Sequence, residues 1–199
     1  LTQNDYNASQ IHAFIFPPLT SIDPATKQQY PLLAAAMPEI SEDRLTFTYR
    51  LRPGVTFSDG EPLGAADVVF TMKATLHPRV NAPVQRQLYT SVADVVALDD
   101  LTVRIQCSEV YFRNPWTLGG IQPIPRHYYD PEDLLGDISV TELNAWDSLP
   151  PAKKERAERF AKQFNEGFQR NPVGPGAFKL VDPQRDWVTG ERVVLTHRD

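Results

Sequence analysis

The fold of this chain is decided by residues 44–72, which are RLTFTYRLRPGVTFSDGEPLGAADVVFTM. Apolar and polar residues alternate from Leu45 to Leu51, and a period of two is typical of a half-buried strand. Pro53-Gly54 has the composition of a tight turn and ends that strand. Val55 and Phe57 then resume the alternation, so the segment predicts a strand, a turn and a second short strand.

The second half of the same stretch predicts a helix from about Ala65 to Leu76. Ser58-Asp59-Gly60 supplies the turn before it, and His77-Pro78 ends it. Asp67 is expected either to face solvent or to cap the helix. The residues at helical spacing that we expect on the buried face are Ala66, Val69, Phe70 and Lys73.

Elsewhere the pattern indicates further elements. Residues 92–98 and 102–107 flank Asp99-Asp100 and predict a β-hairpin. Residues 139–168 are helical in character, with a helix start near Pro151, where proline is tolerated in the first turn. Phe160 and Phe164 are four residues apart, so both can face inward.

Residues 45–70 also resemble the signature of the family 5 extracellular solute-binding proteins, the peptide and nickel binding subunits of bacterial ABC importers. That family's run is approximately LTYTFHLRxGVKFHDGxPhTAxDVxF. Two further segments agree in order: Leu32-Leu33-Ala34 with the family's PxLA, and NPVGPGAFKL at 171–180 with its xPVGTGPYxL. Pro125–Tyr128, PRHY, stands where the family often has PKH. One departure is Gly64-Ala65 in place of TA, which removes the threonine that would cap the helix.

The resemblance covers roughly residues 11–198 and implies an α/β fold, part of one lobe of a periplasmic-binding-protein type II architecture. It implies a mixed sheet, with hairpins and flanking helices, in which the 92–107 hairpin joins the signature strands. We expect residues 1–199 to form a single partial lobe, a fragment of the N-terminal lobe. Within it, 1–40 and 171–199 would adjoin the hinge-side sheet and 41–170 would form a subdomain.

Composition narrows the function classes. The chain has 199 residues, of which 41% are hydrophobic and 23% charged, and these are ordinary globular values. Its net charge of −5 argues against nucleic acid and against an anionic membrane surface. No apolar run approaches the length that spans a bilayer. Cys107 is the single cysteine and lies in an alternating segment, which favours a buried structural thiol.

No constellation in the sequence points to catalysis, to a metal or to a cofactor. The four histidines lack ligand spacing, and no G-x-S-x-G nucleophile elbow occurs. Asp59 and Asp67 are not arranged as an acid–base pair. The loop 171–176, NPVGPG, lacks the features of a phosphate loop and is expected to be a turn, with positive φ at Gly174 and Gly176.

Candidate ligand contacts come from loops rather than from motifs. The turn around Gly119-Gly120 resembles a region that often faces the ligand in the family, which makes Ile121 and Gln122 candidates. Gln85 and Arg86 occupy another loop of that kind. The aromatic residues that could belong either to the core or to a ligand wall are Tyr111, Phe112 and Trp116.

The resemblance therefore implies a binding protein rather than an enzyme, one that captures a peptide or similar small solute between two lobes. Its implied partners are the ligand and the permease subunits of an ABC importer. Its implied location is periplasmic or otherwise extracytoplasmic, with or without a lipid anchor. The implied protein is a monomer whose signal peptide has been removed. Two alternatives remain open: a solute-sensing or interaction module with the same lobe fold, and an α/β hydrolase-like enzyme domain.

Overall fold

The computed structural model describes residues 6–167, 171–188 and 192–198, with side chains from residue 11 onward. The helices are α1 Tyr6–Ile15, α2 Ala65–Leu76, α3 Pro83–Leu88, α4 Asn114–Gly119, α5 Arg126–Tyr129, α6 Val140–Asn144, the 3-10 turn η1 Trp146–Ser148, α7 Pro151–Gly167 and α8 Pro183–Asp186. The strands are β1 Thr20–Ile22, β2 Gln29–Pro31, β3 Glu39–Ile40, β4 Thr46–Arg50, β5 Val92–Ala97, β6 Thr102–Cys107, β7 Phe178–Lys179, β8 Trp187–Val188, β9 Arg192–Val193 and β10 Thr196–His197.

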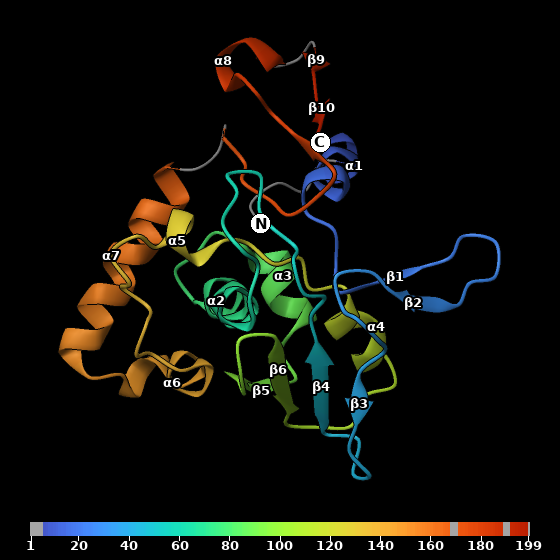
Figure 1. Cartoon of the computed structure of the whole chain (residues 1–199). Coiled ribbons are helices and arrows are strands. Elements are labelled where there is room, and N and C mark those ends of the chain that lie inside the picture. The colour runs from blue at the N-terminus through green and yellow to red at the C-terminus, as the bar shows by residue number, and fades with distance from the viewer. Residues whose placement is uncertain (1–5, 168–170, 189–191, 199) are drawn as a thin grey trace.

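The largest sheet has the strand order β3-β4-β6-β5, so the predicted hairpin does join the signature strand. Every neighbouring pair in this sheet is antiparallel, and the expectation of a mixed sheet was wrong here. The reason is topological. The crossover through α2 and α3 brings β5 back in the direction of β4, but β6 lies between the two strands (Figure 1).

The alternation predicted for the signature strand is confirmed. Phe47, Tyr49 and Leu51 are each at most 2% exposed, whereas Arg50 is exposed. Phe47 lies opposite Ile105 and Tyr49 opposite Val103 of β6, so cross-strand pairs fill the core face. This face of the sheet packs on α2.

Helix α2 has the predicted bounds, and Phe70 is buried as expected, but the other three residues of the predicted buried face are not. Ala66 is exposed, Val69 and Lys73 are half-buried, and Val68 and Met72 are buried instead. The helix lies between the sheet on one side and α7 on the other (Figure 1), and it contributes to two hydrophobic clusters. A helix covered from two sides does not follow a single apolar stripe.

The open edge of β5 is covered by α6. Thr141 Oγ1 donates to the carbonyl of Ala93 at 3.2 Å, and Asn144 Nδ2 donates to the carbonyl of Val92 at 3.0 Å. Side chains of a helix thus occupy acceptors that would otherwise be free to pair with another strand.

The loop 171–176 is the predicted turn between a helix and a strand, but the reason for its glycines differs from the expectation. Positive φ among the described glycines occurs at Gly54 and Gly60, in the two signature turns. Gly174 and Gly176 are required instead by close approach, because a Cβ on either would overlap the backbone of α1. Gly176 N donates to Ile15 O at 2.8 Å.

Candidate ligand-facing surface

The turn that follows α4 is attached to the N-terminal segment of the chain. Leu19 N donates to Ile121 O at 3.0 Å, and Gln122 Nε2 donates to Phe16 O at 2.7 Å. Ile121 is 1% exposed, so its side chain belongs to the core. A Cβ on Gly119 would overlap the side chain of Thr20, which shows how closely the β1–β2 hairpin approaches this turn.

The other two candidates lie on α3. Gln85 is half-buried, and Arg86 Nη2 donates to His77 O at 2.7 Å and also to Val80 O. Arg86 thereby fastens α3 to the end of α2. The hydrogen bonds of Arg86 and Gln122 run to separate segments, and a direct role of the four candidate residues in ligand contact stays a prediction.

The aromatic residues between β6 and the 119–122 turn are on the surface. Phe112 is 71% exposed, Trp116 50% and Tyr111 46%, so of the two alternatives for these three residues the core one was wrong. The Tyr111 and Phe112 rings meet edge to face with centroids 4.9 Å apart, and the Arg113 guanidinium lies 5.7 Å from the Phe112 ring centre. We call residues 110–116 the aromatic segment.

A buried polar network holds this aromatic segment in place. Asn114 is 2% exposed; its Nδ2 donates to Glu109 O at 3.2 Å, and its Oδ1 accepts from Ser91 Oγ at 3.1 Å. Ser108 N donates to Ser91 O at 2.8 Å. Cys107, which precedes the segment, is buried, and burial raises the pKa of its thiol. Exposed aromatic rings thus project from a backbone with satisfied, buried hydrogen bonds.

The two aspartates of the signature serve the fold. Asp67 is 7% exposed, and its two oxygens accept from Gly64 N and Arg126 N, each at 2.9 Å. Helix capping by Asp67 is therefore confirmed, and the solvent-facing alternative was wrong. Burial raises the pKa of Asp67, against the opposite effect of the two backbone hydrogen bonds. Asp59 lies 2.7 Å from His127 Nε2 and so links the signature turn to α5.

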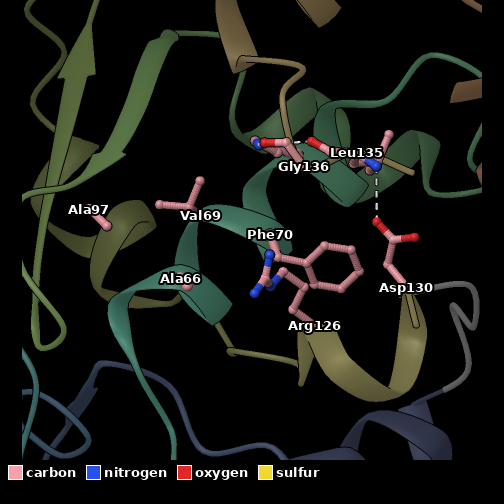
Figure 2. Close-up of a pocket in the computed structure, with 9 residues that line it drawn as sticks. Ala66, Val69, Phe70, Ala97, Arg126, Asp130, Leu135 and Gly136 are labelled. Atoms are coloured by element: carbon pink, nitrogen blue, oxygen red, sulfur yellow. Dashed lines mark hydrogen bonds between the residues drawn. The ribbon is translucent and has the colours of Figure 1, made fainter. Parts of the chain in front are cut away.

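A pocket of about 160 Å³ lies beside α2, and it uses the helix face that was expected to be buried. It is lined by Ala66, Val69, Phe70, Lys73, Ala97, Arg126, Asp130, Leu135 and Gly136 (Figure 2). Lys73 Nζ donates to the carbonyls of Leu135 and Gly136, each at 2.9 Å. Burial lowers the pKa of this lysine.

The described part of the chain holds neither a cluster of metal ligands nor a membrane-spanning helix. Within residues 6–167, 171–188 and 192–198, no three His, Cys, Asp or Glu side chains are grouped so that they could hold a metal ion. In the same ranges, every helix is too short or too polar to cross a bilayer.

The fold is that of a partial α/β lobe found in solute-binding proteins. The profile described as bacterial extracellular solute-binding proteins, family 5 Middle, matches residues 28–199, and this chain belongs to that family. Protein XP55 of Streptomyces lividans is 38% identical over 112 residues, which are 55% of this chain and 20% of XP55. The periplasmic oligopeptide-binding protein OppA of Salmonella typhimurium is 24% identical over 155 residues, 78% of this chain and 26% of OppA.

Solved structures agree on the fold. The oligopeptide-binding protein AppA of Bacillus subtilis, in complex with a nonapeptide, matches 100% of this chain with a TM-score of 0.71 and 22% identity. The ABC transporter substrate-binding protein CtaP of Listeria monocytogenes matches 98% with a TM-score of 0.67 and 28% identity. This chain spans 33% of each of those two structures and 20% to 26% of the two relatives above.

Proposed function

We propose that this chain is part of a binding protein that captures a peptide or similar small solute for an ABC importer. The observation that carries the proposal is the aromatic segment, whose rings are exposed while its backbone is fixed by buried hydrogen bonds. Family 5 proteins are solute-binding proteins, and we infer that this chain likewise binds without catalysing a reaction. Its partners would be the solute and the permease subunits.

The chemistry of the aromatic segment suits a peptide-like ligand. Aromatic rings offer a large contact area with few rotatable bonds, so little side-chain entropy is lost on binding. Exposed apolar clusters on an ordered backbone mark interaction surfaces more often than scattered apolar residues do. Arg113 beside Phe112 adds a cation at the same place, which would suit a carboxylate or a carbonyl group of the ligand.

The four candidate residues fit this proposal mainly as supports of the binding surface. Ile121 and Gln122 fix the turn after α4 to residues 16–19, and Arg86 fixes α3 to the end of α2. Among the described residues, the side chain of Gln85 makes no hydrogen bond, and this polar candidate would therefore be open to a ligand. Contact between ligand and the 119–122 turn would then run through backbone groups and the Gln122 amide.

A location outside the cytoplasmic membrane follows from the same proposal. The OppA relative is named as periplasmic, and family 5 is a family of extracellular solute-binding proteins. We propose a periplasmic or extracytoplasmic location, with a lipid anchor as an additional possibility for the complete protein.

The test is calorimetry of the complete protein with a mixed library of short peptides. Phe112→Ala and Trp116→Ala should each weaken the affinity about tenfold and leave the melting temperature nearly unchanged, because both side chains are at least half exposed. Leu98→Ala is the matched control, since Leu98 is 51% exposed but lies in the β5–β6 turn. Unchanged affinity in both aromatic variants would refute the proposed binding surface.

A further inference from the structure

The pocket beside α2 plays no part in the proposed peptide binding. Its walls are apolar, made by Ala66, Val69 and Phe70 of α2 together with Ala97 and Leu135. Its size, about 160 Å³, is that of a cavity that holds a benzene ring. It therefore offers room for a small apolar group of about six to eight carbon atoms.

The polar groups at this pocket differ in how many hydrogen bonds they can still form. Asp130 is 4% exposed, and its two oxygens already accept from Leu134 N and Leu135 N at 2.8 and 2.9 Å. Lys73 gives two hydrogen bonds to carbonyls, and an ammonium group has three donors. Arg126 Nη1 donates to Asp133 at 3.0 Å, which is one of the five donors of a guanidinium.

Lys73 and Arg126 thus bring unused donors to a pocket with apolar walls, and the carboxylates of Asp130 and Asp133 already accept hydrogen bonds from the protein. Asp130 and Asp133 balance the formal charges of Lys73 and Arg126, so a preference for an anion would come from the unused N–H donors at the pocket rather than from net charge. A carboxylate matches the geometry of a guanidinium and accepts from an ammonium group, and these charge-assisted bonds are stronger than neutral ones. We propose that this pocket is a second ligand site, which binds a small carboxylate with an apolar body of the size of benzoate.

Position separates this site from the aromatic segment. The pocket is formed by α2, the end of β5, α5 and the loop after α5, whereas the aromatic segment lies between β6 and the 119–122 turn. The two sites can therefore be tested independently, and failure of one leaves the other untouched.

The experiment is a titration of the isotope-labelled 199-residue chain with sodium benzoate, followed by amide NMR shifts. We expect shifts concentrated at residues 66–73, 97, 126 and 135–136, with a Kd in the millimolar range, because benzoate has few atoms. Benzamide, which has the same shape without the charge, should bind several times more weakly.

Two variants test the cations. Arg126→Gln should weaken benzoate binding about tenfold and should fold normally, because its ion pair with Asp133 is exposed. Lys73→Met keeps the apolar stem and should weaken binding to a similar extent. Lys162→Met, an exposed lysine of α7, is the matched control. The proposal is overturned by shifts outside the pocket, by absence of shifts at 50 mM benzoate (roughly fifty times the expected Kd), or by equal affinity in Arg126→Gln and the control.

Discussion

Asp67 offers the sharpest test of how the signature stabilises this fold. Its two carboxylate oxygens accept from two backbone N–H groups at 2.9 Å, and the residue is 7% exposed. Asp67→Ala leaves both donors without a partner, at a cost of about 1–3 kcal/mol for each. Water that enters the vacated space recovers part of this, so we expect the free energy of unfolding to fall by about 3 kcal/mol.

Asp59 is the matched control, because it belongs to the same signature and differs in burial. Its side chain is 32% exposed, and its partners are Glu61 N at 3.2 Å and His127 at 2.7 Å. Surface pairs contribute about 0–1 kcal/mol, so Asp59→Ala should have a small effect. In thermal unfolding, 1 kcal/mol corresponds to about 2–4 °C at this size. Asp67→Ala should therefore lower Tm by about 6–12 °C, and equal shifts in the two variants would refute the reasoning.

The pH dependence gives an independent check of the burial of Asp67. Because its pKa is raised in the folded protein, the folded state holds this proton at a higher pH than the unfolded state does. The resulting stabilisation is complete below the unfolded pKa of about 4 and is lost as pH rises through the raised folded pKa. The stability of the wild type minus that of Asp67→Asn should thus be larger at pH 4 than at pH 7. If the stability difference between the wild type and Asp67→Asn grew with pH, a raised pKa of Asp67 in the folded protein would be contradicted.

Three further predictions follow from packing and geometry. Phe57→Ala should lower the free energy of unfolding by about 3–5 kcal/mol, because Phe57 is fully buried. Thr56→Ala loses a hydrogen bond from Arg198 and should lower it by about 1 kcal/mol. Equal Tm shifts in the two variants would show that the register assigned to this segment is incorrect. Gly174→Ala should lower the free energy of unfolding by about 1–3 kcal/mol through overlap with α1. Gly167→Ala at the end of α7 should be neutral or slightly stabilising, and chemical denaturation measures both variants. By calorimetry, the 199-residue chain should show no measurable affinity for short peptides and a protein extended through the second lobe should bind at about micromolar Kd or tighter; equal affinities would exclude a shared cleft.

The elements that the sequence predicted well are those that local chemistry determines. The alternation of β4, the turns at Gly54 and Gly60 and the bounds of α2 all follow from period, turn residues and proline. The β5–β6 hairpin and the start of α7 at Pro151 belong to the same class. Each of these depends on neighbours within a few residues, and so a single sequence suffices.

The predictions that were wrong concern contacts between distant segments. The face of α2 that is buried depends on α6 and α7, which follow it by more than sixty residues. The exposure of Phe112 and Trp116 depends on the buried pair of Ser91 and Asn114, for which no sequence pattern exists. The need for glycine at 174 comes from α1 at the other end of the chain. Hydrophobicity and spacing carry no information about such approaches.

The signature itself acts as a junction between parts of the lobe. Its polar contacts run from Asp67 to Arg126, from Ser58 N to Gly174 O at 3.0 Å, and from Thr56 to Arg198. None of these contacts points to the aromatic segment, so the signature residues link distant segments of the chain and take no part in the proposed binding surface. Under the proposed function, specificity would lie at the aromatic segment and the 119–122 turn, where substitutions would change contacts without disturbing the junction.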